Sequence, residues 1–406
     1  MDPTQRLPHV ALACALSLGA AVSLGITRFA YGLLLPPMRA DLHWSYTLAG
    51  AMNTANALGY LLGALVTPQL MRRLGPSRLA VGGSVLATVF MTLSGFFTDA
   101  TALLVQRVLA GIASAFLFIA GGLLAARLGG MQTRRAGLLL GLYYGGTGLG
   151  IVASALLVPA VLEAAQAHAH AWSWAWWALA LACALATAVL AWPTRVLARV
   201  DAAQQPANGV QANAAARAFR WRDFAPGLAG YMMFGVGYIG YMTFVIALLR
   251  EQSVAQPKIT LFYALLGIAV LASSRIWAGL LDRFREGQPL ALLNALLGVA
   301  TLVPALTSAW PLVLASGLLF GAVFLSVVAS TTALVRHNLP PAQWAAGISA
   351  FTIVFAAGQI AGPTIVGWIA DGAGGLARGL VFSAGALWLG ALLAWRQPAL
   401  PRPVLT

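Results

Sequence analysis

Long uninterrupted runs of apolar residues dominate the chain. Each is long enough to cross about 30 Å of hydrocarbon as an α-helix, which takes roughly 20 residues. The runs without any Asp, Glu, Lys or Arg are 44–71, 79–98, 136–162, 171–194, 224–249, 338–370 and 287–335, the last long enough for two helices with a turn at 308–311. Interrupted runs lie at 10–38, 100–126, 258–281 and 374–395. The pattern predicts twelve membrane-spanning helices, the first ending at Pro36 and Pro37.

None of these runs alternates polar and apolar residues with a period of two, as the strands of a membrane β-barrel do. The composition agrees with a helical membrane protein, because 60% of the residues are hydrophobic, only 8% are charged and the mean hydropathy is +0.83. Soluble domains carry roughly 25% charged residues. We therefore expect an all-α integral membrane protein whose solvent is the lipid bilayer.

The basic residues lie close to the ends of the predicted helices and mostly on one side of the membrane. With the N-terminus placed inside, most of the 24 Lys and Arg residues fall in cytoplasmic segments, as Arg72 and Arg73 do. The positive-inside rule then predicts that both termini are cytoplasmic. Membrane orientation thus explains the formal net charge of +14, and we expect no nucleic-acid partner.

A polar stretch separates two sets of six predicted helices. Residues 195–222 are rich in Ala, Gln and Asn, and they predict a cytoplasmic linker between an N-terminal bundle at 1–194 and a C-terminal bundle at 223–406. Sliding one half over the other by 210 residues superposes Gly25 on Gly235, Tyr31 on Tyr241, Arg73 on Arg283, Gly111 on Gly321 and Gly148 on Gly358. Two six-helix repeats around a site at the membrane midplane are typical of secondary transporters.

Several short motifs resemble those of the major facilitator superfamily. The loop after the second predicted helix reads PQLMRRLGPSR and keeps Arg73 and Gly75, but Arg72 stands where the family has an acid. The loop after the eighth reads AGLLDRFREGQ and keeps Asp282 and Arg283. The remaining motif positions are Arg107 and Gly111 in the fourth helix and Gly358, Gly362, Pro363, Gly367 and Asp371 in the eleventh.

Two helices narrow this resemblance to the YbfB/YjiJ-type branch of bacterial facilitators. They read GITRFAYGLLLPPM at 25–38 and NTANALGYLLGAL at 53–65. The resemblance implies two six-helix bundles that rock around a cavity lined mainly by the first, fourth, seventh and tenth helices. It also implies that the two loop motifs form a gating latch on the cytoplasmic face, weakened in the first half by Arg72.

Ionisable residues inside the predicted spans are candidates for function, because a charge at membrane depth costs several kcal/mol. All ten acids and five histidines lie in loops or near predicted helix ends, which leaves Arg28, Arg107 and Arg275. Arg275 lies close enough to the cytoplasmic end to serve structure or gating. Arg28 either bonds backbone carbonyls of a neighbouring helix or engages an anionic substrate, since its planar fork matches a carboxylate. For Arg107 the resemblance implies proton coupling, cavity structure or substrate contact.

The repeat places the positive charge on one side of the expected cavity only, because Arg28 superposes on Tyr238. Organophosphate exchangers of the superfamily resemble one another in carrying a basic residue on both the first and seventh helices, so a singly charged organic anion is favoured here. Asn56 and Gln359 are either ligand contacts or interhelical hydrogen bonds. The candidate substrate-binding residues are Arg28, Tyr31, Asn56, Arg107, Tyr238, Tyr241 and Gln359.

These observations predict a secondary active transporter for a small organic solute, with an organic anion favoured, in the inner membrane of a bacterium. A coupling proton would travel on the carboxyl group of the substrate. The alternatives are efflux of hydrophobic drugs or metabolites and, in another class, a membrane sensor built on the same fold. We expect a monomer without cofactor or metal and no enzymatic activity, because no nucleophile–base pair or metal-ligand cluster is evident.

Overall fold

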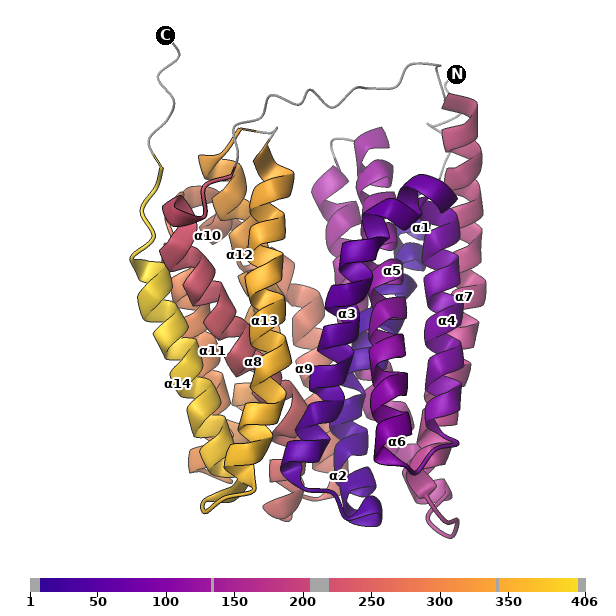
Figure 1. Cartoon of the computed structure of the whole chain (residues 1–406), viewed down its shortest axis with the longest axis vertical. Helices are drawn as coiled ribbons and strands as arrows, with labels where there is room; N and C mark the ends of the chain where they lie inside the picture. The colour runs from indigo at the N-terminus through magenta and orange to yellow at the C-terminus, as the bar shows by residue number, and fades with distance from the viewer. Residues whose placement is uncertain (1–7, 133–134, 205–218, 341–342, 401–406) are drawn as a thin grey trace.

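The computed structural model describes residues 8–132, 135–204, 219–340 and 343–400, which are almost entirely helical. The helices form two bundles that stand side by side (Figure 1). The N-terminal bundle consists of α1 (His9–Ala20), the π-helix η2 (Ala21–Phe29), α2 (Tyr31–Leu42), α3 (Tyr46–Leu74), α4 (Pro76–Ser94), α5 (Ala100–Met131), α6 (Ala136–Ala164) and α7 (Ala171–Gln204). The C-terminal bundle consists of the 3-10 turn η4 (Trp221–Phe224), α8 (Ala225–Glu251), α9 (Gln256–Ile276), α10 (Ala278–Arg283), α11 (Gln288–Leu306), α12 (Trp310–Asn338), α13 (Trp344–Ala370) and α14 (Gly375–Trp395).

Within these ranges, eleven helical segments are long and apolar enough to cross a membrane. The first crossing, His9–Leu42, joins α1, η2 and α2 into one helical column. α3 is not among the eleven, although its 29 residues are enough to cross a membrane, because it carries more polar side chains, of which Asn53 and Asn56 are almost fully buried. The prediction of an all-α membrane protein with about twelve long helices is therefore confirmed.

The sequence sets several helix starts. The side chains of Ser45 and Asp99 accept hydrogen bonds from the backbone N–H groups of Leu48 and Ala102, which lack partners in the first turns of α3 and α5. Pro residues occupy the first turn of α4, α8, α9, α11 and α12, where a missing N–H does no harm. The turn between α3 and α4 needs a positive φ of 78° at Gly75, a conformation that glycine adopts without strain.

The internal repeat is visible in how the bundles pack. A Cβ atom on Gly111 of α5 would lie 2.1 Å from the carbonyl oxygen of Asn56 in α3. A Cβ atom on Gly321 of α12 would lie 2.3 Å from the carbonyl oxygen of Leu266 in α9. Both members of the second pair lie 210 positions after those of the first. Each glycine thus lets the same two helices of its half approach backbone to backbone.

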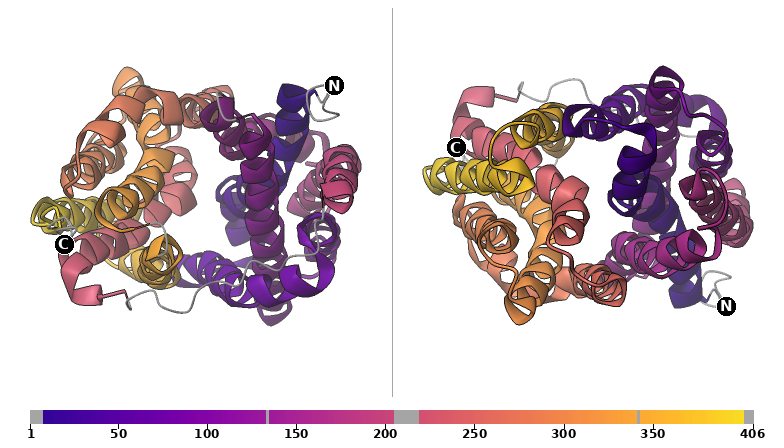
Figure 2. Two further views of the ribbon diagram at one scale, coloured as in Figure 1. Left: turned by 90° about the horizontal axis from the view of Figure 1, so that it is seen from above. Right: turned by 90° about the horizontal axis from the view of Figure 1, so that it is seen from below.

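The two bundles meet mainly along two edges, α3 against α13 and α6 against α9 (Figure 2), and more narrowly where α2 touches α8. Glycine permits the close approach at both edges. A Cβ atom on Gly50 would lie 2.2 Å from the carbonyl oxygen of Pro363, and one on Gly148 would lie 2.4 Å from that of Gly267. We call the end at which α1 begins and α3 ends the terminal end, and the end at which α3 begins and α13 ends the distal end.

Two expected boundaries differ from the structure. The first crossing does not end at Pro36 and Pro37 but continues to Leu42, where His43 adopts a left-handed conformation and closes α2. Proline fixes φ near −65°, a value compatible with an α-helix, so α2 continues through both prolines, although each removes one N–H donor and crowds the carbonyl four residues earlier. The expected linker at 195–222 begins as helix, because α7 runs on to Gln204, while residues 205–218 lie outside the described ranges.

Candidate functional site

The first crossing contains a nine-residue π-helix, η2, that carries Arg28. Within it, the Thr27 hydroxyl donates a 2.7 Å hydrogen bond to the carbonyl of Val22, five residues earlier. The Ser23 carbonyl accepts a 3.0 Å bond from the Ser114 hydroxyl of α5. A Cβ atom on Gly25 would lie 2.6 Å from the carbonyl oxygen of Thr147, so α6 passes against this turn. Such π-turns occur often at functional sites.

Arg107 of α5 is fully engaged by the N-terminal bundle. Its Nη1 donates a 2.8 Å hydrogen bond to the carbonyl of Thr27 in η2, and its Nη2 donates a 2.9 Å bond to Oδ1 of Asn53. Its Nε donates a 3.3 Å bond to the carbonyl of Met52. These bonds tie the π-helix and α3 to α5. One of the two alternatives predicted for Arg28 was a set of hydrogen bonds to backbone carbonyls of a neighbouring helix. In the structure Arg107 makes such bonds.

Two further predicted site residues belong to the same connection. Asn56 donates a 3.2 Å hydrogen bond to the carbonyl of Arg107. The Tyr31 hydroxyl donates a 2.9 Å bond to the carbonyl of Ala49, and the Tyr31 ring lies 5.0 Å from the Arg107 guanidinium carbon. Both side chains are almost fully buried. They hold the N-terminal bundle together through partners within it.

Arg28 contrasts with Arg107. Its side chain is only 3% exposed, and neither Nε nor Nη2 has a hydrogen-bond partner among the described residues. Its guanidinium carbon lies 5.9 Å from the ring centroid of Tyr60 in α3, and its charge acts on the hydroxyls of Tyr60 and Tyr238. A buried donor without a partner costs about 1–3 kcal/mol, and more when it is charged. Arg28 is thus a desolvated cation with two donors available for an anion.

Tyr238 and Gln359 lie in the C-terminal bundle, and Tyr238 is near enough for the charge of Arg28 to act on its hydroxyl. The Tyr238 hydroxyl donates a 2.5 Å hydrogen bond to Oε1 of Gln359, joining α8 to α13. The Tyr238 ring is stacked on Phe324 with a centroid distance of 5.2 Å. The predicted site residues Arg28, Tyr238 and Gln359 therefore come together around Tyr60. We call Arg28, Tyr60, Tyr238 and Gln359 the central site.

The remaining predicted residue, Tyr241, lies within the C-terminal bundle. Its hydroxyl shares a 3.3 Å hydrogen bond with Ser316, and its ring stacks on Phe320 at 4.1 Å between centroids. Its partner in the repeat, Tyr31, likewise bonds within its own bundle.

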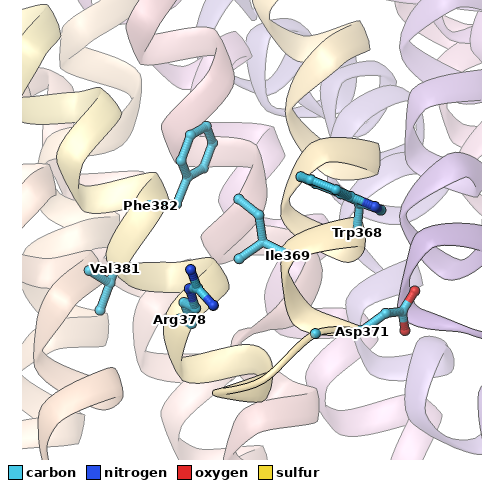
Figure 3. Close-up of a pocket in the computed structure, with 7 residues that line it drawn as sticks. Trp368, Ile369, Asp371, Arg378, Val381 and Phe382 are labelled. Atoms are coloured by element: carbon cyan, nitrogen blue, oxygen red, sulfur yellow. The ribbon is translucent and has the colours of Figure 1, made fainter.

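A second polar cluster joins the bundles at the distal end. The Asp371 carboxylate follows α13 and accepts hydrogen bonds from the backbone N–H groups of Tyr46 (2.6 Å) and Thr47 (2.8 Å) at the start of α3. The Tyr46 hydroxyl also donates to Glu251, at the end of α8. Figure 3 shows Asp371 pointing toward the N-terminal bundle and away from Arg378. We call Asp371 with Tyr46, Thr47 and Glu251 the distal latch.

Electrostatic interactions favour the ionised form of the Asp371 carboxyl in the distal latch. Partial burial alone would raise the pKa of the Asp371 carboxyl, but the hydrogen bonds from Thr47 and Tyr46 and the charge of Arg39 outweigh burial, and the pKa lies below its ordinary value of 3.8. The Arg39 guanidinium carbon lies 3.7 Å from the ring centroid of Tyr46. Asp371 also sits where the positive end of the α3 dipole stabilises an anion.

Hydrogen bonds between the bundles extend from the distal latch toward the centre. Nδ2 of Asn53 donates a 2.8 Å bond to the Thr243 hydroxyl, and the Thr54 hydroxyl donates a 2.7 Å bond to the carbonyl of Ile360. The Tyr263 hydroxyl donates a 2.8 Å bond to the carbonyl of Phe29. Within the described residues, every hydrogen bond between the bundles lies between the middle of the helices and the distal end. The distal side is therefore closed by polar contacts.

The loop-motif residues lie at the terminal end. Gly75 makes the turn after α3, and Arg73 and Asp282 are exposed without a hydrogen-bonding or ion-pair partner among the described residues. The Arg283 guanidinium carbon lies 5.7 Å from the ring centroid of Phe284 in its own bundle. In this conformation the expected latch between the loop motifs is not formed.

A hollow of about 600 Å³ lies at the distal end of α13 and α14, where Figure 3 shows Trp368 and Phe382 on its walls. All of its lining residues belong to the C-terminal bundle or the adjoining turn. The hollow shares Asp371 with the distal latch, but none of its lining residues belongs to the central site, which remains the candidate for the substrate.

Sequence reasoning missed Tyr60, the π-helix and the distal latch. Tyr60 lies four residues after Asn56 and seven after Asn53, and therefore on the same face of α3. Following that face along the helix would have identified it. Asp371 was recognised only as a motif position, because its partners Tyr46 and Thr47 carry no local signal of contact across 324 residues.

Comparison with known proteins agrees with this architecture. Residues 20–395 match the family described as "Uncharacterised MFS-type transporter YbfB". Similar solved structures include a bacterial homologue of the human lysosomal transporter Spinster in an inward-facing, unoccupied conformation (14% identity, 97% of each chain, TM-score 0.69) and the nucleoside transporter NupG (13%, 97% of this chain and 98% of that one, 0.70). The human organic anion transporter MFSD10 is also similar (15%, 96% and 100%, 0.65). At these identities the likeness shows the fold alone. No curated protein matches the sequence.

Proposed function

Because the chain belongs to the YbfB-type family of major facilitator superfamily transporters, we propose that it moves a small organic anion across a bacterial inner membrane by alternating access. The observation that carries the proposal is the guanidinium of Arg28, which is 97% buried, leaves Nε and Nη2 without partners among the described residues, and acts through its charge on Tyr238 of the other bundle. An arginine without a partner in a dry environment gains a charge-assisted hydrogen bond when an anion binds. The structural neighbour MFSD10 is described as an organic anion transporter, which is consistent with this class of solute.

The orientation of the chain follows from its charges. The terminal end carries Arg72, Arg73, Arg283, Arg285 and Arg336, and the positive-inside rule assigns that end to the cytoplasm. In this orientation the distal end faces outward, and it is the side that hydrogen bonds between the bundles hold closed. The gating motifs at the cytoplasmic end would come together only when the carrier turns outward.

Thermal unfolding of the purified full-length protein tests the proposal, because a ligand that binds only the folded state stabilises it by mass action. The protein would be screened against organic anions and against neutral and cationic compounds of similar size. We expect stabilisation by anions that disappears in Arg28→Gln and persists in Arg195→Gln, which removes an exposed arginine of α7. Equal stabilisation of wild type and Arg28→Gln by cationic or neutral compounds contradicts the anion proposal and favours hydrophobic efflux.

A further inference from the structure

The C-terminal bundle contains a set of nearly parallel aromatic rings that includes Tyr238. The Phe355 ring of α13 stacks on Tyr231 at 4.9 Å with an interplanar angle of 20°, on Phe234 at 5.3 Å with 10°, and on Tyr238 at 5.6 Å with 21°. The Tyr238 ring in turn stacks on Phe324 of α12 at 5.2 Å with 20°. Three helices thus present their rings in almost one orientation. We call Tyr231, Phe234, Tyr238, Phe324 and Phe355 the ring wall.

The ring wall and the cation meet at the boundary between the bundles. Phe29, the residue after Arg28, makes an edge-to-face contact with Phe324, with ring centroids 5.6 Å apart at 84°. The charge of Arg28 acts on the hydroxyl of Tyr238, which belongs to the wall. Tyr60 and Phe355 retain partial exposure, whereas Tyr238 and Phe324 are buried. A solute bound to Arg28 would lie beside Tyr60, and Phe355 is the ring of the wall that retains exposed surface for a second contact.

The available donors of Arg28 indicate the shape of the anion. Nε and Nη2 lie on the same edge of the guanidinium and point in one direction, which is the geometry that binds the two oxygens of a carboxylate side by side. Arg107, the other buried arginine of the N-terminal bundle, has its three nitrogens bonded to protein oxygens. Of the two buried arginines in the described part of the chain, Arg28 alone has donors without partners, and a single cation matches a single negative charge.

Taking the proposed function as its basis, we propose that the transported anion is an aromatic monocarboxylate whose carboxylate binds Nε and Nη2 of Arg28 and whose ring lies against Phe355 in the ring wall. Flat rings attract one another in offset or edge-to-face arrangements beyond the burial of apolar area alone. A ring of the same size without π electrons gains the burial but not this attraction. The central site therefore selects for aromaticity as well as for charge.

Isothermal titration calorimetry with matched acids separates the two requirements. The pairs are benzoate against cyclohexanecarboxylate and 3-phenylpropionate against 3-cyclohexylpropionate, with benzyl alcohol as the uncharged aromatic control. We expect each aromatic acid to bind about two- to tenfold more tightly than its saturated partner. Benzyl alcohol should bind far more weakly than benzoate, and Arg28→Gln should lose binding of all four acids.

Variants of the ring wall show which residue causes the preference for aromatic over saturated acids. Phe355→Leu should bring the affinity ratio of aromatic to saturated acid close to one while carboxylate binding persists, and Phe355→Tyr, which keeps a ring, should restore the ratio. Phe351→Leu is the matched control, because Phe351 is buried but meets Tyr231 at 63°, outside the parallel set. Unliganded thermal unfolding of each variant shows whether it is folded.

The outcomes distinguish the inference from the proposed function. Equal affinity for aromatic and saturated acids in the wild type overturns the aromatic preference and leaves the anion proposal standing. A preference that survives Phe355→Leu overturns the placement of the ring on Phe355. If none of the acids binds, or if benzyl alcohol binds as tightly as benzoate, both the anion proposal and this inference are overturned.

Discussion

The Thr47 hydroxyl donates a 2.6 Å hydrogen bond to Oδ2 of Asp371, although the two residues lie 324 positions apart and in different bundles. The same carboxylate accepts the N–H groups of Tyr46 and Thr47, which a helix start normally leaves without partners. One side chain from the C-terminal bundle thus caps a helix of the N-terminal bundle. The cap exists only while the distal side is closed, so Asp371 couples the local start of α3 to the conformation of the whole carrier.

Replacing Asp371 by asparagine should open the distal side more often. The amide cannot carry the negative charge that the α3 N-terminus and Arg39 stabilise. The loss of roughly 1 kcal/mol corresponds to about a fivefold shift in the equilibrium between the closed and the open distal side. The measurement is maleimide labelling of Met242→Cys, a buried position of α8, in a background with Cys14→Ser and Cys183→Ser.

Glu163→Gln is the matched control for this variant, because Glu163 is an exposed acid at the distal end of α6. It should leave the labelling rate unchanged. An unchanged rate in Asp371→Asn as well would mean that the distal latch does not hold the bundles together.

The contribution of the Asp371 carboxylate to the stability of the fold should vanish in acid. Its folded pKa lies below the ordinary value of 3.8, so the carboxylate contributes fully above that value, and the contribution is lost as the pH falls through the lower folded pKa. Arg39 and Tyr46 also act on this group, and Glu251 accepts a hydrogen bond from the Tyr46 hydroxyl. We expect the difference in thermal midpoint between wild type and Asp371→Asn to be constant from pH 7 to about pH 5 and to shrink below about pH 4. A difference that grows on acidification would contradict this sign.

The two buried arginines should respond oppositely to neutralisation. Arg107→Gln removes three donors and leaves buried oxygens on Thr27, Asn53 and Met52 without partners, which should lower the free energy of unfolding by about 1–3 kcal/mol. Arg28→Gln removes an unpaired charge and should leave the free energy of unfolding unchanged or higher. Reversible unfolding in mixed micelles without ligand measures both. Equal destabilisation by the two variants would show that Arg28 is also a structural residue.

Gly50 should be intolerant of even a methyl group when the distal side is closed. Its Cβ atom would lie 2.2 Å from the carbonyl oxygen of Pro363 in the other bundle, so Gly50→Ala must push α3 and α13 apart. We expect faster labelling of Met242→Cys in this variant. Gly82→Ala is the control, since a Cβ atom there meets nothing within 4 Å. Unaltered labelling in Gly50→Ala would show that the bundles do not need this close approach.

The fold could be predicted from the sequence because each membrane helix appears as a long run of apolar residues without charge. The absence of charge over 44–71 or 171–194 marks a helix wherever it packs. The site could be predicted only in part. Arg28 is conspicuous at membrane depth by its charge alone, whereas Tyr60 is one aromatic residue among many, and its importance depends on which face of α3 meets η2. The π-helix also turns Tyr31, three residues after Arg28, toward Arg107 and Ala49.

The hydrogen bonds that distinguish Arg107 from Arg28 could not be predicted from the sequence either, because they depend on the tertiary structure. Both are single arginines in apolar helices, and their difference rests on carbonyl groups that η2 and α3 present in three dimensions. Asn53 shows the same limit. Its Oδ1 accepts from Arg107 and its Nδ2 donates to Thr243, so one amide connects the core of one bundle to the other. No spacing in the chain encodes that pair of contacts.

The unpaired charge of Arg28 has a kinetic consequence for the transport cycle. An empty carrier that reorients must keep this cation bare in a dry environment throughout the transition, whereas a loaded carrier makes the same movement with the cation neutralised. On the proposed function, we therefore expect the return of the empty protein to be the slow half of the cycle. We expect anion on the opposite side of the membrane to accelerate release of preloaded anion, so that counterflow outpaces net transport, and Arg28 acts as a brake on uncompensated turnover.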